Sequence, residues 1–294
     1  MGTIFETLKS IGVASDDTKS LFASRTRDNA DIQVWQDSQS QVIYIDGFYV
    51  GEKEYETGEY REQEIRGQHA ELSGGDYESV ADAARRLSDY QQFYVGKDIC
   101  DVGCGDGAFL KGAQKLASRV SGVELQDAYL TQLQDKGIEC EQSILNYQTS
   151  FQTVFMFHSL EHFEDPLQIL QNIRLKMTRD QSTLIIEVPH ANDFLISTLK
   201  CEEFVEFTLW SQHLILHTRE SLKRLLNKAG FSNVIVEGKQ RYGISNHLTW
   251  LNEKRGGGHK SPLSSFETEN LKLAYEGALQ KIDATDTLVA IAEI

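Results

Sequence analysis

A glycine-rich turn constrains the fold of this 294-residue chain more than any other feature. The segment Asp101–Leu110, DVGCGDGAFL, follows a short apolar run typical of a buried strand and leads into a segment with helical periodicity. Its glycines, at positions 103, 105 and 107, allow the backbone to turn tightly and to come close to a ligand. A helix that begins after such a turn favours a carboxylate or phosphate at its N-terminus. The turn therefore predicts a ligand site between a strand and a helix.

Around this turn, apolar runs alternate with amphipathic segments from about Tyr77 onward. We expect strands at 97–103, 119–125, 153–160, 182–189, 231–238 and 287–294, and a strand or turn at 137–144. Helices are expected at 79–94, 108–118, 128–136, 166–177 and 219–230. Strands separated by helices of this length predict right-handed crossovers and a parallel sheet, which is an α/β fold.

Residues 1–75 are polar and rich in turns, and we interpret them as a small N-terminal accessory module. Within them Asp31–Asp46 alternates apolar and polar residues on both sides of a polar turn, which predicts a β-hairpin. The acidic stretch Glu52–Glu64 is interpreted as a solvated connector. Residues 76–294 then form the main domain.

The second half of the chain contains a long connection between its last two expected strands, at about 239–286. Before it, Thr218 is placed to cap a helix that Gly230 ends. The connection is longer than a hairpin requires, and it is aromatic and basic in an otherwise acidic chain. We interpret it as a lid or substrate platform in which the glycines at 256–258 adapt to a ligand; a solvated loop is the alternative.

The charge balance excludes several partners. With 29 Lys+Arg against 44 Asp+Glu, the formal net charge is −15, so phosphate backbones and anionic membranes are repelled and neither nucleic acid nor a membrane is an expected partner. No apolar run reaches the roughly 18 residues of a membrane span, and the N-terminus does not resemble a signal peptide. The four cysteines form no CxxC pair, which argues against a zinc site or a disulfide framework. We expect a soluble cytoplasmic protein.

A second acidic residue, Glu124 in SGVEL, ends the strand that follows the glycine turn, where a carboxylate can bind both hydroxyls of a ribose. In combination, DVGCGDG and GVEL resemble the class I S-adenosylmethionine (SAM)-dependent methyltransferases, over about residues 77–294. The resemblance implies a Rossmann-like, seven-stranded, mostly parallel sheet whose last strand, 287–294, is antiparallel. A dinucleotide-binding Rossmann enzyme and a SAM-binding fold without catalysis remain alternatives.

The same resemblance implies which residues bind SAM. The glycine loop contacts the methionine end, Glu124 holds the ribose, and Leu125 lies against the adenine. The adenine is flanked by the segment around Ser143, and the fourth strand of the cofactor domain ends beside the methyl donor. The expected cofactor-binding residues are Asp101, Gly103, Cys104, Gly105, Glu124, Leu125, Ser143, Ile144, Phe157 and His158.

Three histidines are candidates for the catalytic base. His158 and His162, in FHSLEHFEDP, follow an expected strand, and chemistry in such sheets gathers beyond the carboxyl ends of the strands. A methyl transfer to a hydroxyl needs a group that accepts its proton, and histidine titrates near neutrality. His213 is a further candidate. The alternative is that these histidines only shape the pocket. No metal site is expected, because no carboxylate set completes one around His158 and His162.

The substrate class follows from a narrower resemblance. SQHLILHT, QRYGISNHLTW and the GGGHK turn resemble bacterial methyltransferases of sugars and surface polysaccharides. The N-terminal hairpin also resembles the leading module of that group, which often carries paired cysteines for zinc, but this chain has no cysteine before Cys100. The resemblance implies O-methylation of a nucleotide-sugar or polysaccharide precursor. The expected substrate-binding residues are His190, Asn192, Arg241, Tyr242 and His247.

Alternatives to this function remain open on the sequence alone. They are a methyltransferase for another small molecule, such as C-methylation of a ketosugar or a quinone-type acceptor, and a SAM-binding partner protein without catalysis. No motif indicates an oligomeric state, and a homodimer is one assembly that the sequence leaves open.

Overall fold

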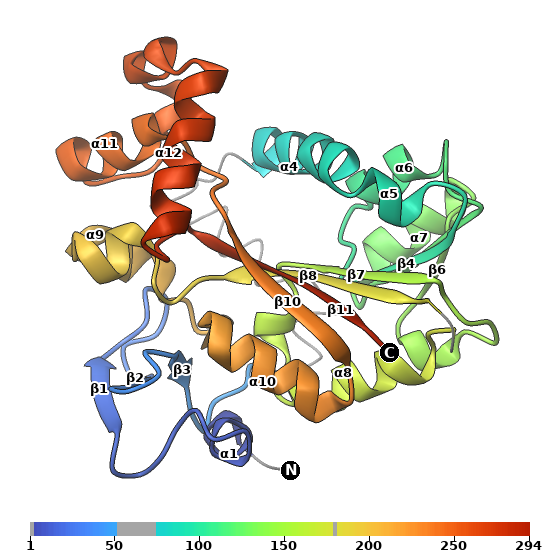
Figure 1. Ribbon diagram of the computed structural model, residues 1–294, viewed down its shortest axis with the longest axis horizontal. Helices are drawn as coiled ribbons and strands as arrows, with labels where there is room; N and C mark the ends of the chain where they lie inside the picture. The colour runs from blue at the N-terminus through green and yellow to red at the C-terminus, as the bar shows by residue number, and fades with distance from the viewer. Residues whose placement is uncertain (1–2, 52–74, 179–180) are drawn as a thin grey trace.

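The computed structural model describes residues 3–51, 75–178 and 181–294, and the acidic stretch Glu52–Glu64 lies outside them. A seven-stranded sheet crosses the centre of the molecule (Figure 1). Its strands are β4 (Asp98–Val102), β5 (Arg119–Val123), β6 (Glu139–Glu141), β7 (Thr153–Phe157), β8 (Thr183–Pro189), β10 (Ser232–Lys239) and β11 (Thr287–Glu293). They lie in the order β10-β11-β8-β7-β4-β5-β6.

The sheet is parallel from β8 to β6, and β11 runs antiparallel to both of its neighbours. Thr287 at the start of β11 pairs with Pro189 at the end of β8. Every residue of β7 is buried, as expected for a central parallel strand covered on both faces. The predicted α/β fold, with seven strands and an antiparallel last strand, is confirmed.

Helices cover both faces of this sheet. In Figure 1, α8 (Pro166–Leu175) and α10 (Arg219–Ala229) lie on one side. The other side has α4 (Gly75–Asp89), α5 (Gln91–Tyr94), α6 (Ala108–Ala113) and α7 (Asp127–Asp135).

Local sequence sets the ends of two of these helices. Proline occupies the first turn of α8, where its missing N–H costs no hydrogen bond. Thr218 caps α10 in a capping box with Ser221, and Gly230 ends the helix in the left-handed conformation. The start of α8 and the start and end of α10 are where the sequence predicts them.

The N-terminal residues form a second, four-stranded sheet below the first in Figure 1. After α1 (Ile4–Ser10) come β1 (Lys19–Ala23), β2 (Val34–Asp37) and β3 (Ile43–Ile45). The predicted hairpin is confirmed as β2 and β3, with Val34 opposite Ile45. The fourth strand, β9 (Ile215–Leu216), comes from the distant part of the chain that precedes α10.

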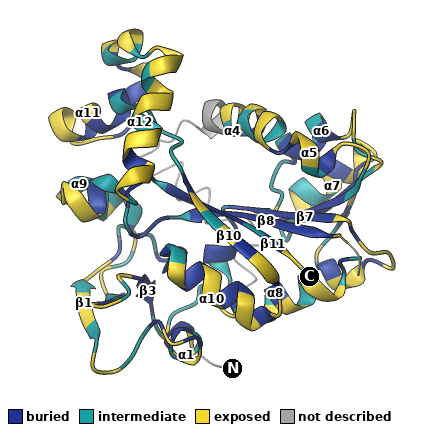
Figure 2. Cartoon of the chain, viewed as in Figure 1, coloured by how far each residue is buried: buried dark blue, intermediate teal, exposed yellow. Residues whose placement is uncertain are grey.

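The two sheets share one hydrophobic core. Buried residues of the N-terminal module, such as Ile43 and Tyr44, belong to the same cluster as Met156 and Ile186 of the central sheet. Figure 2 draws the central strands β7 and β8 and, on the other side of α10 in this view, strand β3 in the dark blue of buried residues. The module therefore packs as part of the main body.

Between β10 and β11 the chain builds a helical segment that projects from the body in Figure 1. It contains α11 (Ile244–Glu253), the 3₁₀ helices η4 (Gly258–Lys260) and η5 (Pro262–Phe266), and α12 (Glu269–Lys281). Gly258 is buried, and a Cβ there would lie 2.2 Å from the Cα of Asn246. This glycine allows η4 to pack closely on α11, which differs from the adaptable turn that the sequence suggests. Among the described residues, none of the helices combines the length and apolar character of a membrane span.

Candidate active site

The glycine turn after β4 is open to a ligand. Gly103 is exposed and has φ +79°, and a Cβ there would lie 2.6 Å from the Cβ of Ser159. Ser159 is held in place because its hydroxyl donates to the Val102 carbonyl at 2.8 Å. Only glycine satisfies both the backbone conformation and the close approach. The predicted loop therefore presents exposed main chain at the carboxyl end of the central strand.

Asp101 lies beneath this loop as an incompletely paired buried acid. Its side chain is 3% exposed, and its Oδ1 has no hydrogen-bond partner among the described residues. Burial raises the pKa of Asp101 to about 7. A buried carboxylate oxygen without a partner fits a cationic ligand group such as an ammonium.

Glu124 braces the same loop from the end of β5. Its Oε2 accepts the Gly105 N–H at 2.7 Å, and its Oε1 accepts the Gln126 N–H at 2.8 Å. The carboxylate is therefore fixed beside the loop, where its remaining lone pairs can accept from ribose hydroxyls. Leu125 is partly exposed next to it.

The remaining predicted cofactor residues line the same edge of the sheet. Ser143 caps a short 3₁₀ helix, η1 (Ile144–Asn146). The side chain of Ile144 is in the core, and Leu145 beside it is exposed. The Cys104 side chain packs toward Gly122 of β5. Phe157, at the end of β7, stacks with Tyr90 of the α4–α5 region.

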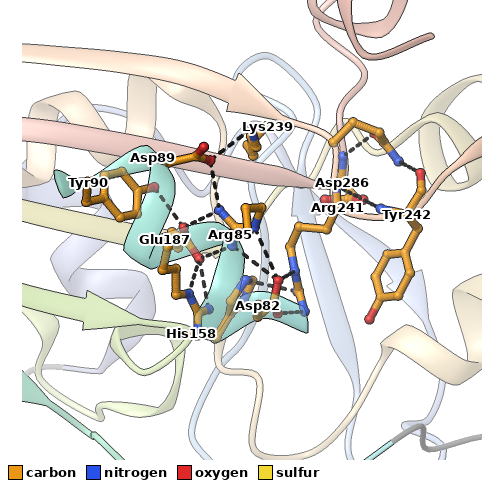
Figure 3. A network of polar contacts seen from close by, with 12 residues as sticks. Asp82, Arg85, Asp89, Tyr90, His158, Glu187, Lys239, Arg241, Tyr242 and Asp286 are labelled. Carbon is orange, nitrogen blue, oxygen red and sulfur yellow. Dashed lines mark hydrogen bonds and ion pairs between the residues drawn. The ribbon is translucent and has the colours of Figure 1, made fainter. Parts of the chain in front are cut away.

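Beyond the cofactor loop, a buried ion-pair network joins α4 to β8 (Figure 3). Glu187 of β8 is fully buried. Arg85 donates to both of its carboxylate oxygens at 2.8 Å, Arg86 donates Nε–H to Oε2 at 2.9 Å, and the Tyr90 hydroxyl donates to Oε1 at 2.7 Å. Burial alone would raise the pKa of Glu187, but these arginines hold it well below its usual value. The network fixes α4 across the ends of the central strands.

Arg241, from the segment after β10, extends this network towards the end of β7, as Figure 3 shows. Its guanidinium pairs with Asp82 of α4 at 2.5 Å, and its Nη1 lies 3.0 Å from His158 Nε2. Asp286 accepts the backbone N–H groups of Arg241 and Tyr242 at 2.9 and 3.0 Å. Burial would raise the pKa of Asp82, but Arg241 and the α4 arginines lower it to about 2.

These contacts determine the protonation of His158. An arginine can only donate, so His158 Nε2 must accept from Arg241 and the ring hydrogen is on Nδ1. His158 Nδ1 lies 3.4 Å from Oε1 of the buried Glu161. Burial, with the charges of Arg241 and Arg86, holds the pKa of His158 well below its usual value. At neutral pH this imidazole is uncharged, with its lone pair towards Arg241.

A cavity of about 230 Å³ lies where these elements meet. Histidine, arginine and aromatic side chains line it together. They come from the N-terminal module, the strand ends, the α9 region and the β10–β11 segment. The lining includes Arg27, His158, His190, Phe204, Phe207, His213, Arg241, Tyr242, Trp250 and Asp286. Phe204 and Phe207 belong to α9 (Glu202–Thr208) and pack on Trp250, each with ring centroids 5.2 Å apart.

The structure separates the predicted substrate residues into three places. His190, Arg241 and Tyr242 line this cavity. Asn192 instead lines a larger cleft of about 870 Å³ between the N-terminal module and α9. His247 is buried in α11, where its Nδ1 lies 2.7 Å from the Tyr275 hydroxyl, and it is not among the residues that line either space.

Two of the three predicted catalytic histidines line the cavity, and the third does not. His158 and His213 line the cavity, whereas His162 is not one of its lining residues. His162 instead packs beside His213, with ring centroids 5.2 Å apart. Burial holds the pKa of His213 well below its usual value, and the neighbouring His162 lowers it further.

Sequence reasoning missed several of these residues. Arg85, Arg86 and Glu187 meet across about a hundred residues of chain, and Arg27 reaches the cavity from the N-terminal module. No local spacing indicates such contacts. Only α4 carries a feature in the sequence that points to such a contact. Its consecutive arginines, Arg85 and Arg86, lie on an amphipathic helix and indicate an anionic partner.

Comparison with known proteins agrees with this arrangement. Residues 72–236 match a family model described as a methyltransferase domain. The fold is similar to that of a SAM-dependent methyltransferase from Archaeoglobus fulgidus, with a TM-score of 0.51 and 18% identity over 81% of this chain and 99% of that one. It is also similar to a methyltransferase in a complex with the Haloferax volcanii Trm112 methyltransferase activator, with a TM-score of 0.50 and 12% identity over 82% and 96%. A comparison with curated proteins found no significant match.

The family match covers more than half of the chain and includes the glycine turn, Asp101 and Glu124. The exposed loop, the unpaired Asp101 oxygen and the braced Glu124 carboxylate fit the ammonium and ribose groups of S-adenosyl-L-methionine, which is the cofactor. The chain belongs to the methyltransferase domain family and is a SAM-dependent methyltransferase with the class I fold.

Proposed function

We propose that this methyltransferase transfers a methyl group to a hydroxyl of a sugar, as part of a nucleotide-sugar or a surface-polysaccharide precursor. One observation carries the proposal: the 230 Å³ cavity combines a neutral histidine, cationic side chains and aromatic rings. This volume is below the roughly 300–1,000 Å³ of sites for drug-sized ligands, so it suits one ring with the rest of the acceptor outside.

The walls of the cavity support a sugar with an anionic group. Phe207 and Trp250 supply flat apolar surface on which the carbon face of a sugar ring can pack. Arg27 and Arg241 supply positive charge that favours a phosphate or carboxylate on the acceptor. The overall charge of −15 is a property of the whole chain, whereas Arg27 and Arg241 place two positive side chains in the wall of this cavity.

His158 is the proposed base. SAM supplies an electrophilic methyl group on its sulfonium. An acceptor hydroxyl that replaces Arg241 as the donor to His158 Nε2 can pass its proton to that nitrogen as the oxygen–methyl bond forms and the sulfur–methyl bond breaks, which leaves a neutral thioether. Glu161 Oε1 lies 3.4 Å from His158 Nδ1, where an ionised carboxylate stabilises the imidazolium that results. His213 is the second candidate, because it lines the same cavity.

The test is product analysis with a panel of acceptors. Enzyme and SAM are incubated with nucleotide-sugars, free sugars, phenols and quinols, and products are analysed by mass spectrometry and NMR. We expect a methyl ether on a sugar hydroxyl. A methyl group on carbon, or methylation of only the phenols and quinols, would contradict the proposal.

The role of His158 is tested separately at saturating SAM. His158→Ala should lower the single-turnover rate by about 10²–10⁴-fold, the usual contribution of a general base. His259→Ala is the matched control, because His259 lies in η4 and does not line the cavity. Equal rates for both variants would exclude His158 as the base.

A further inference from the structure

Three side chains that can bind a metal ion come together next to the cavity of about 230 Å³, which is called the acceptor cavity below because the proposed function places the acceptor there. Glu161, His162 and His213 each offer one ligand atom, and these atoms all lie within 4.8 Å of one another. Glu161 and His162 belong to η2 (Leu160–His162), and His213 comes from the segment between α9 and β9. The fold therefore assembles a two-histidine, one-carboxylate cluster that is not visible as a spacing in the sequence.

Main-chain carbonyls orient both imidazoles of this cluster. His162 Nδ1 lies 2.9 Å from the Gln212 carbonyl oxygen, so the ring hydrogen is on Nδ1 and the lone pair is on Nε2. His213 has a hydrogen bond with the Thr208 backbone, while its buried Nδ1 has no hydrogen-bond partner among the described residues. In protein metal sites, ligating histidines are oriented in this way by a hydrogen bond from the other ring nitrogen.

The carboxylate of the cluster lacks hydrogen bonds. Glu161 is 1% exposed, and neither of its oxygens has a hydrogen-bond partner within the described part of the chain. The uncharged His158 ring lies beside it, with Nδ1 3.4 Å from Oε1. Burial raises the pKa of Glu161 to about 8, because an ionised carboxylate without a partner is costly to bury. Buried charges in proteins are usually paired or coordinate metals. A cation beside Glu161 would remove this cost, and one oxygen would still be able to face His158.

We propose that Glu161, His162 and His213 bind a divalent transition-metal ion, with Zn²⁺ as the first candidate. Two imidazoles and a carboxylate are the protein ligands of one class of catalytic zinc sites, which keep a fourth position for water or substrate. Imidazole ligands select Zn²⁺, Fe²⁺, Ni²⁺ or Cu²⁺, whereas Mg²⁺ and Ca²⁺ prefer sites made of oxygen ligands.

Neighbouring arginines lower the affinity of this cluster for a metal cation. Arg27 acts on His213, and Arg241 and Arg86 act on Glu161. These arginines repel a metal cation, so the cluster should bind Zn²⁺ more weakly than an isolated structural zinc site does. Arg241 and Arg86 are themselves paired with Asp82 and Glu187, which reduces their effect.

The position of the cluster gives the ion a role. His213 lines the acceptor cavity, so the open coordination position of a bound ion can face an acceptor oxygen. There the ion would act as a Lewis acid that orients a hydroxyl and lowers its pKa. This role rests on the proposed function, whereas the presence of the ion does not.

The first experiment uses the full-length wild-type protein without acceptor. The protein is treated with chelator, dialysed and titrated with Zn²⁺ in competition with a chromophoric chelator, and its metal content is measured by elemental analysis. Loading with Co²⁺ gives a visible spectrum that reports the ligand geometry. We expect one ion per chain and a Co²⁺ spectrum typical of nitrogen and oxygen ligands. Binding of neither ion would overturn the proposal.

Variants then locate the ion. Glu161→Gln keeps the shape of the side chain and removes its charge, and His213→Gln removes one imidazole. Each should weaken Zn²⁺ binding by about 100-fold or more and change the Co²⁺ spectrum, since loss of even an outer-shell partner costs 10–100-fold. His259→Gln is the control and should bind as the wild type does. Calorimetric SAM binding by each variant shows that it is folded.

The outcomes separate this proposal from the proposed function. If Zn²⁺ binds equally to the wild type and to both cluster variants, the site is wrong, whatever the acceptor assays show. If Zn²⁺ binding depends on the cluster but no sugar is methylated, the metal site stands and the acceptor proposal fails.

Discussion

At the scale of single residues, Asp101 gives the clearest test of the cofactor site. Its carboxylate is buried with one oxygen unpaired, and its pKa is raised to about 7. Asp101→Asn should weaken SAM binding by about 10–100-fold, because hydrogen bonds to charged groups contribute about 1.5–3 kcal/mol. The affinity of the wild type should rise as the pH increases through about 7, where the carboxylate ionises. Calorimetry one pH unit below and above this value measures both effects.

The control for this prediction lies on the same strand. Asp98→Asn changes an acid at the opposite end of β4, where Asp98 faces Arg119 at 3.5 Å. It should leave SAM affinity and its pH dependence unchanged. A wild-type affinity that is flat with pH, or equal losses in both variants, would contradict the role of Asp101.

Glu124 supports a second residue-scale prediction. Glu124→Ala removes the acceptor of the Gly105 and Gln126 N–H groups and the carboxylate that faces the ribose. The dissociation constant for SAM should rise by about 10–100-fold, since two charged hydrogen bonds are lost. Glu141→Ala, at the end of the neighbouring β6, is the matched control. Unchanged calorimetric affinity in Glu124→Ala would show that the ribose is held elsewhere.

At the scale of secondary-structure elements, the contact between α4 and β8 depends on one buried acid. Glu187→Gln leaves the Arg85 and Arg86 cations without their main anionic partner. Breaking a buried ion pair in this way typically destabilises a protein by about 3–5 kcal/mol. Urea unfolding at neutral pH should show a loss of this size. Glu237→Gln, an exposed glutamate on β10, should change stability by less than about 0.5 kcal/mol.

The same element has a defined pH dependence. The pKa of Glu187 is lower in the folded chain than in the unfolded one, so its stabilisation is complete above about 4.3 and is lost as the pH falls further. The stability difference between wild type and Glu187→Gln should therefore shrink at acid pH. A difference that stays constant down to the acid limit of folding would contradict this network.

Among the secondary-structure elements, the sequence predicts those set by local residues and not those set by distant segments. The hairpin around Ser38–Ser40, the Thr218 cap and the glycine turn each depend on neighbours within a few residues, and all three are where they were expected. Strand β9 and the Glu161–His162–His213 cluster depend on segments that meet only after folding. Local periodicity contains no information on such meetings, so the sequence indicates single residues of the site, such as His158 and Arg241, but not the contacts that bring them together.

At the scale of the whole molecule, the shared core makes the N-terminal module part of one folding unit. Trp35 lies in β2 of that module and Trp250 in α11, so fluorescence reports on both regions. Ile43, fully buried in β3, belongs to the common core. Ile43→Ala should destabilise the protein by about 2–5 kcal/mol, and fluorescence and circular dichroism should still report one coincident transition.

The control for this prediction is an exposed residue of the same module. Leu21→Ala, in β1 and 52% exposed, should change stability by less than about 0.5 kcal/mol. Two separate transitions, with Ile43→Ala shifting only the first, would instead show that the module folds on its own.

The place of β11 in the sheet has a consequence for the order of assembly. Among the described strands β10 pairs only with β11, which is synthesised after the whole segment 240–286. A growing chain on the ribosome therefore exposes an unpaired β10 edge until residues 287–293 emerge. Arg241 and Tyr242 follow β10, and Asp286, which accepts their backbone N–H groups, directly precedes β11. The glycine turn after β4 is thus synthesised well before the last elements that line the 230 Å³ cavity.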